Sequence, residues 1–223
     1  MTLEIRRLHL AALRGTDGRD CPVHGFVIIH PGGAALVDTG VGGPDDLLSD
    51  WRVVNRTAAD ALAGIGMSPA DIGLVINTHL HFDHCGQNAV FAHAPVYVQR
   101  AELARATREA PELCDWLGFM NASFELLDGD AEILAGVSVI TTPGHTAGHQ
   151  SVVVRTGDGS ADLLTGDAAY TPRQYREPPG PGGGGLPDGQ AADFGAWQAS
   201  LARMHALGAG RVHFCPHTAV VHD

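Results

Sequence analysis

The residues with the clearest chemical potential stand together in His79-Leu80-His81-Phe82-Asp83-His84, directly after the apolar run LVINT. Three imidazoles and a carboxylate within six residues are hard to explain as core, because such groups are costly to bury unless they are paired or metal-bound. Histidine suits borderline metals such as zinc, and the carboxylate can serve as a ligand or a base. Alternation along an extended segment points the rings of 79 and 81 the same way, and the two residues after them reach elsewhere. The cluster therefore predicts ligands for two ions rather than a polar, histidine-rich loop.

Three further candidate ligands each follow an apolar run. His145 stands in TPGHT, Asp167 in LTGD and His217 in FCPH. A strand end that delivers a polar side chain into a shared cleft is a common way to assemble a site. Each residue alone could be an ordinary turn or surface residue, but together with the first cluster they predict one metal site with seven ligands.

The elements that must position these residues are short strands and a few helices. Consecutive strands early in the chain and helices interspersed later predict two packed sheets with helices outside. The expected strands are Leu3–Leu10, Gly25–Ile29, Ala34–Val37, Gly73–Asn77, Val96–Val98, Glu132–Ile140, Ser151–Val154, Asp162–Leu164 and Arg211–Cys215. The expected helices are Thr57–Ile65, Ala101–Leu117 and Phe194–Leu207, and the Gly-rich segment 178–186 is interpreted as a surface loop or a lid.

The composition of the chain limits the fold and the kinds of partner that it can have. The chain has 223 residues, of which 44% are hydrophobic and 17% charged, which suits one domain over residues 1–223 with a sizeable core. Its net charge of -11 argues against nucleic acid or an anionic membrane as partner, because both need a basic surface. No apolar stretch is long enough for a membrane span or a secretory signal, and the four cysteines form no C-x-x-C pair. These features predict a cytoplasmic protein with a small-molecule substrate and leave a homo-oligomer open.

The order H-x-H-x-D-H, P-G-H-T, T-G-D and a late histidine resembles the metallo-β-lactamase superfamily, from Leu36-Val37-Asp38-Thr39-Gly40 to His217. The resemblance implies an α/β fold, a four-layered αβ/βα sandwich with the site at one edge. It also implies two zinc ions, although other divalent transition metals fit the same ligands. One ion would take His79, His81 and His145, the other would take Asp83, His84 and His217, and Asp167 would bridge both. Asp38 looks like the family's structural aspartate, a support rather than a ligand.

Such a pair of ions suits hydrolysis without a serine or cysteine nucleophile. Two dications roughly 3.5–4 Å apart share a water, lower its pKa and provide a metal-bound hydroxide that attacks an electrophilic carbonyl. Within the superfamily, His81 disfavours the redox di-iron members, which typically have glutamate there. Asp167 and the lack of lysine disfavour zinc β-lactamases, and the negative charge disfavours nucleases.

Tyr170, three residues after Asp167, together with the strings HLHFDHCGQN and PGHTAGHQS, resembles the N-acyl homoserine lactone lactonases, enzymes of quorum quenching. The resemblance implies that Tyr170 holds the lactone carbonyl, and we expect Asp83 to protonate the leaving alkoxide. Trp51 lies where lactonases place acyl-chain contacts, although core packing explains it equally well.

Two departures from the lactonase pattern leave alternatives open. Gln87 stands where these lactonases usually have a second glycine, and Thr218 stands where they usually have aspartate. A thioesterase of the glyoxalase II type, or another acyl-ester hydrolase of the same fold, is the first alternative. A non-catalytic metal-binding protein is a more remote one.

Overall fold

The computed structural model describes residues 3–14, 20–110, 123–155, 157, 159–180, 190–215 and 220–222. It divides into two units, each with its own sheet and core. The first unit comprises Glu4–Val98 and Ala106–Leu126, and the second comprises Met1–Leu3, Gln99–Arg105 and Leu127–Asp223. That residues 1–223 form a single domain stays a prediction.

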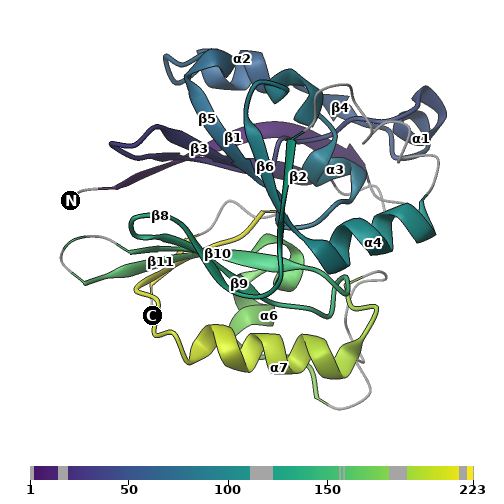
Figure 1. Cartoon of the computed structure of the whole chain (residues 1–223). Coiled ribbons are helices and arrows are strands. Elements are labelled where there is room, and N and C mark those ends of the chain that lie inside the picture. The colour runs from purple at the N-terminus through teal and green to yellow at the C-terminus, as the bar shows by residue number, and fades with distance from the viewer. Residues whose placement is uncertain are drawn as a thin grey trace. The chain divides into compact units, whose positions relative to one another are not determined.

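The first unit is built on a mixed seven-stranded sheet in the order β4-β1-β2-β3-β5-β6-β7 (Figure 1). β1, β2 and β3 are antiparallel neighbours, whereas β3, β5 and β6 run parallel. The strands are β1 Glu4–Arg14, β2 Asp20–Ile29, β3 Ala34–Val37, β4 Val54–Asn55, β5 Ile72–Ile76, β6 Pro95–Gln99 and β7 Ser123–Leu127. The helices are α1 Asp45–Asp50, α2 Ala58–Ala63, η1 Pro69–Asp71, α3 Phe82–Cys85 and η2 Asn88–Phe91, and α4 Arg100–Glu109 begins in the second unit and ends in the first.

The core of the first unit lies between this sheet and α2. Leu8, Leu36 and Val75 from the strands are fully or almost fully buried together with Leu62 of α2. Thr57 caps α2, because its hydroxyl accepts a hydrogen bond from the Asp60 N–H at 3.0 Å. The strand β3 is buried along its whole length and β2 along a run of six residues, so the central strands are continuous buried runs rather than alternating ones.

The second unit has a six-stranded sheet in the order β13-β12-β11-β10-β9-β8, in which only β11 and β12 are parallel among the described pairs. Helix α7 runs along this sheet (Figure 1), and its Trp197, Leu201 and Met204 share a core with Leu163 and Val212 of the strands. The strands are β8 Ala131–Leu134, β9 Val137–Thr141, β10 Gln150–Arg155, β11 Ala161–Leu164, β12 Arg211–His213 and β13 Val220–His222. The helices are η3 Gly166–Ala168, α6 Pro172–Arg176 and α7 Phe194–His205.

Most expected elements are confirmed, and one strand prediction is wrong. Residues 132–140 form a hairpin of β8 and β9 rather than one strand, because Gly136 turns the chain with a φ of 81°. The sequence also missed the short strands β4, β7 and β13 and the short helices α1 and α6. The last part of the expected helix Ala101–Leu117 and residues 181–186 of the Gly-rich segment lie outside the described residues.

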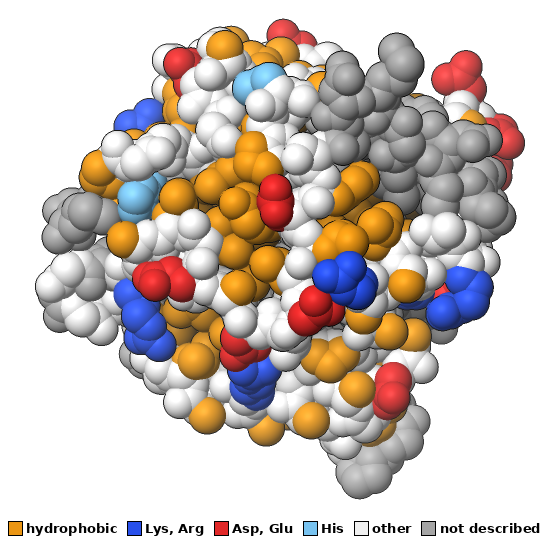
Figure 2. Space-filling view, in the orientation of Figure 1, with side chains coloured by type: hydrophobic (Ala, Val, Ile, Leu, Met, Phe, Trp, Pro, Cys, Tyr) orange, Lys and Arg blue, Asp and Glu red, His pale blue; other side chains and the backbone are white. Residues whose placement is uncertain are grey.

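The surface carries both signs of charge. Arginines pair with acidic side chains, as in Arg100–Asp128 at 3.0 Å and Arg14–Asp20 at 2.9 Å. On the face drawn in Figure 2, arginine and acidic side chains likewise stand side by side. Among the described residues, no helix has both the length and the apolar character that crossing a bilayer requires.

Candidate metal centre

The histidine cluster of the first unit follows β5 and runs into the four-residue helix α3. His79 is fully buried, His84 is 1% exposed and His81 is half-buried at the N-terminus of α3. The turn is fixed from the loop after β3, because the Thr39 and Gly42 N–H groups donate to the carbonyls of His84 and Phe82 at 2.7 and 3.0 Å. The end of β5 and this loop therefore hold the cluster on a rigid part of the unit.

Asp38 supports the cluster from behind, as the resemblance implies. It is 3% exposed and adopts a φ of 58°, a left-handed conformation that aspartate tolerates better than most residues. Its carboxylate accepts hydrogen bonds from the Thr78 N–H at 2.8 Å, the Thr78 hydroxyl at 2.8 Å and His84 Nδ1 at 2.9 Å. Because a carboxylate can only accept here, the His84 proton is on Nδ1 and the lone pair that could bind a metal is on Nε2.

The same chain of hydrogen bonds sets the tautomer of His79. The Thr78 hydroxyl gives its proton to Asp38 and therefore accepts from His79 Nδ1, 3.1 Å away. The lone pair of His79 is then on Nε2, which lies 3.0 Å from Nδ1 of His81. His84 Nε2 lies 3.7 Å from Asp83 Oδ2, and the Asp83 side chain is 19% exposed. The four predicted ligands of the first unit therefore form two pairs, His79 with His81 and Asp83 with His84, in which the possible metal-binding atoms face each other.

The second unit brings His145 and Asp167 together. His145 Nε2 lies 3.4 Å from Asp167 Oδ2, and both side chains are more than nine-tenths buried. His145 Nδ1 donates to the Gln190 carbonyl at 3.1 Å, which leaves the lone pair on Nε2. The Gln190 side chain in turn donates to the Asp167 carbonyl at 2.6 Å, so this fully buried residue braces both candidate ligands.

His149 forms local hydrogen bonds and supports Asp167. Its Nε2 accepts from the Asp167 N–H at 3.0 Å, so its proton is on Nδ1, which donates to the Thr142 hydroxyl at 2.8 Å. That hydroxyl donates to Ser151, and Ser151 donates to the Thr165 carbonyl. The Asp167 N–H at one end of this buried chain can only donate, and the Thr165 carbonyl at the other end can only accept, so the direction of every bond between them is fixed. His149 is therefore a neutral support and not a ligand.

Tyr170 lies beside the His145–Asp167 pair. Its ring centroid is 6.1 Å from that of His145 in an edge-on arrangement, and the side chain is half-buried. The backbone after it is fixed, because the Tyr170 N–H donates to the Gln174 side chain at 2.9 Å and Thr171 caps α6. The structure therefore places Tyr170 next to a candidate ligand, whereas His217 and Thr218 lie outside the described residues.

Trp51 and Gln87, whose surroundings the sequence left open, both have definite neighbours in the structure. Trp51 is 44% exposed, so it is not a core residue, and its ring centroid lies 5.7 Å from that of Phe82 in the ligand cluster. Gln87 accepts from the Ala58 N–H at 2.7 Å and donates to the Arg56 carbonyl at 3.1 Å. The departure from glycine at position 87 therefore gives α2 an additional partner for its N-terminus.

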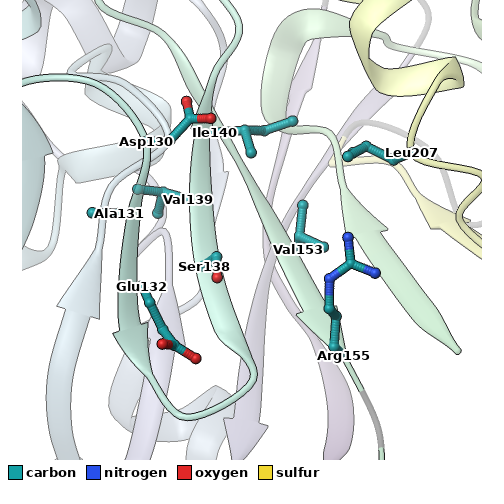
Figure 3. A pocket seen from close by; sticks show the side chains of 9 residues that line it. All are labelled: Asp130, Ala131, Glu132, Ser138, Val139, Ile140, Val153, Arg155 and Leu207. Atoms are coloured by element: carbon teal, nitrogen blue, oxygen red, sulfur yellow. The ribbon is translucent and has the colours of Figure 1, made fainter. Parts of the chain in front are cut away.

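A shallow pocket of about 300 Å³ on β8, β9 and β10 of the second unit is a different feature (Figure 3). No histidine or cysteine lines it, and its two carboxylates have local partners. Asp130 accepts from the Thr141 N–H at 3.0 Å and Glu132 accepts from the Gly136 N–H at 3.0 Å. Both carboxylates accept from backbone N–H groups, and Asp130 also pairs with Arg203, so the pocket is not a candidate metal centre.

Cys85 and Cys215 are expected not to be ligands, although both are close to candidate ligands in sequence. Each is 3% exposed, and Cys85 Sγ donates to the His81 carbonyl at 3.2 Å. Replacing both by serine should keep the metal content and most of the activity, because the predicted ligand set is complete without them. The check is elemental analysis of the zinc-reconstituted variant. Metal loss with an unchanged circular dichroism spectrum would make one of the thiols a ligand.

Comparison with known proteins gives a consistent result. A family model described as the metallo-beta-lactamase superfamily matches residues 18–217. An N-acyl homoserine lactonase of a Bacillus species is 33% identical over 171 residues, covering 70% of this chain and 67% of that protein. The N-acyl homoserine lactonase AttM of Rhizobium radiobacter is 32% identical over 208 residues, covering 79% and 76%.

The structural comparison agrees. A solved N-acyl homoserine lactone hydrolase with the product N-hexanoyl-L-homoserine at its catalytic metal centre superposes with a TM-score of 0.75 and 25% identity. The match covers 95% of this chain and 91% of that one. A quorum-quenching N-acyl homoserine lactone lactonase superposes with a TM-score of 0.78 and 26% identity, over 96% and 92% of the two chains. The fold expected from the sequence is confirmed.

Proposed function

Since this chain belongs to the metallo-β-lactamase superfamily and is a metal-dependent hydrolase, we propose that it opens the ring of an N-acyl homoserine lactone or a related lactone. The substrate class is proposed from its relatives, which are named for this activity, and from Tyr170 beside the His145–Asp167 pair. The metal requirement is proposed to be met by two ions, zinc first among the candidates.

The spacing of donor atoms is the observation that carries the metal proposal. Two atoms bound tetrahedrally to one zinc ion at about 2.0–2.2 Å lie roughly 3.3–3.6 Å apart. The His79–His81, His145–Asp167 and Asp83–His84 pairs have separations of 3.0, 3.4 and 3.7 Å, close to this range. In the proposed division each pair shares an ion: His79 and His81 with His145 on one, Asp83 and His84 with His217 on the other, and Asp167 on both. The donor chemistry of the described residues therefore fits the two ions.

The supporting hydrogen bonds fit the same proposal. Metal-bound histidines usually donate their second ring N–H to a carboxylate or a carbonyl. His84 does so to Asp38 and His145 does so to the Gln190 carbonyl, each from Nδ1. Both rings would then bind through Nε2 with their orientation already set. Bound dications would supply Lewis acidity toward the lactone carbonyl and an activated water.

The protein's own residues would do the remaining work. The Tyr170 hydroxyl would donate a hydrogen bond to the lactone carbonyl oxygen and stabilise the negative charge that develops there, without adding a charge of its own. Asp83 would take the proton of the attacking water and pass it to the ring oxygen as the C–O bond breaks. The partial exposure of Asp83 fits a group that exchanges protons, and the exposed Trp51 beside Phe82 offers an apolar surface for an acyl chain.

The proposed function also specifies the binding partner of the chain and its cellular compartment. A small lactone is the proposed partner, rather than nucleic acid or a membrane, and the acidic net charge of -11 supports this. The proposed compartment is the cytoplasm, as the sequence pattern of four cysteines without a C-x-x-C pair predicts.

A substrate panel tests the function. The zinc-reconstituted chain should open N-acyl homoserine lactones of several acyl lengths and release one acid equivalent per ring, and Asp83→Asn should slow this reaction more than any turnover of S-lactoylglutathione. The physical reason is that an alkoxide is a poor leaving group that gains from a nearby acid, while a thiolate leaves readily without one. The measurements are proton release and chromatography of the hydroxy-acid product.

The panel also separates the alternatives. Good turnover of the thioester without lactone opening would replace the lactonase by the glyoxalase II type of hydrolase. Lactone binding without turnover of any ester, thioester or phosphodiester would point instead to a non-catalytic metal-binding protein.

A further inference from the structure

The loop that carries His145 is held by a buried carboxylate at the beginning of α4. Glu102 is fully buried, and its Oε2 accepts hydrogen bonds from the Thr146 hydroxyl at 2.6 Å and from the Gly148 N–H at 3.2 Å. Thr146 is the residue directly after His145. A glutamate 43 positions before the candidate ligand in sequence therefore anchors the backbone next to it.

The other oxygen of Glu102 is fixed from the opposite side. Oε1 accepts from Arg105 Nε at 3.0 Å and from Arg105 Nη2 at 2.6 Å, and Arg105 is itself only 7% exposed. These four hydrogen bonds hold the carboxylate from two sides, two from a guanidinium and two from the ligand-bearing loop. A buried carboxylate with a matched charge and so many donors is strongly oriented.

The packing around Gly148 shows how closely the loop and the helix meet. A Cβ atom on Gly148 would lie 2.2 Å from the Glu102 backbone N and 2.5 Å from its Cα. Only glycine fits there, because backbone atoms of the helix cannot move aside as a flexible side chain could. The loop therefore rests directly on the first turn of α4, and a shift of either would be passed to the other.

We propose that Glu102 is a positioning residue for the metal centre. It fixes the Thr146–Gly148 backbone so that His145, held on its other side by the Gln190 carbonyl, presents Nε2 to the metal in one orientation. This inference rests on the proposed metal centre but not on the proposed substrate. Residues that orient ligands without touching the metal typically contribute about 10–100-fold to metal affinity or activity.

Glu102→Gln tests the inference, because it preserves the shape of the side chain and removes its charge. The amide group can no longer accept from Arg105 and the loop at once, so the loop should loosen. Zinc affinity, measured by competition with a chromophoric chelator, should fall about 10–100-fold. The absorption spectrum of the cobalt-substituted protein should change in parallel, since it reports ligand geometry directly.

Two controls separate positioning from general destabilisation. Asp162→Asn removes another buried carboxylate of the second unit, 2% exposed and bonded to Arg211 through both oxygens at 2.7 Å. It should lower the thermal stability of the metal-free protein without a comparable loss of zinc affinity. Glu109→Gln, on the exposed end of α4, should change neither.

Thr146→Val keeps the test decisive if Glu102→Gln does not fold. It removes one hydroxyl donor and leaves the Glu102–Arg105 pair in place, so it should weaken zinc binding several-fold in the same direction. Unchanged zinc affinity and cobalt spectrum in the folded variants would overturn the inference, even if stability falls as in Asp162→Asn. Wild-type protein that binds zinc but opens no lactone would contradict the proposed substrate alone.

Discussion

Asp167→Ala is expected to lose metal and to reduce lactone hydrolysis by well over a hundredfold. Asp167 is the proposed bridge between the two ions, so its loss removes one ligand from each, which should exceed the roughly 10–100-fold effect of losing a supporting partner. Its carboxylate lies 3.4 Å from His145 Nε2, and its backbone is fixed by His149 and Gln190, so the carboxylate is held in place beside that ring.

Metal stoichiometry and rate should be measured on the same samples. The wild-type chain should bind two equivalents of zinc and the variant should bind fewer, and Asp167→Asn, which keeps one oxygen donor, should fall between them. Two equivalents and a full rate in Asp167→Ala would show that the bridge is assigned wrongly. At most one equivalent in the wild-type protein, even after reconstitution, would contradict the two-ion proposal itself.

Asp83→Asn is expected to slow lactone opening more than Tyr170→Phe does. Tyr170→Phe removes a single proposed hydrogen bond to the carbonyl oxygen, so we expect a rate loss of about 10–100-fold, comparable to or below the cost of one oxyanion donor, with unchanged metal content. Asp83→Asn removes both a proposed ligand and the proposed proton donor, so its rate loss should be larger and accompanied by metal loss.

Tyr175→Phe is the matched control for Tyr170→Phe. Tyr175 lies five residues further along the chain, in α6, and is 1% exposed in the core of the second unit. Its substitution should leave the rate of lactone hydrolysis unchanged, although it can lower stability. A full rate in Tyr170→Phe, or equal rate losses in the two tyrosine variants, would remove Tyr170 from the proposed chemistry.

The sequence by itself determined the candidate ligands and the elements that precede them. Histidines and aspartates after apolar strands have few structural explanations, because burying them without a partner is costly. The runs Ala34–Val37 and Gly73–Asn77 are recognisable as strands because they are apolar and short, and β3 and β5 lie there. The confusion of the β8–β9 hairpin with one strand arose because both strands are apolar and the turn at Gly136 is short.

Only the tertiary structure decided how the ligands are supported. Glu102 lies 44 residues from Thr146, and Gln190 lies 45 residues from His145, and no local pattern marks a glutamate on a helix or a glutamine in a loop as a partner of a distant histidine. Trp51 is equally ambiguous in the sequence, since an isolated tryptophan suits a core and a binding surface alike, and its exposure settled that it is not in the core. Local propensity and periodicity are encoded in neighbouring residues, whereas hydrogen-bond partners and burial depend on which distant segments the fold brings together.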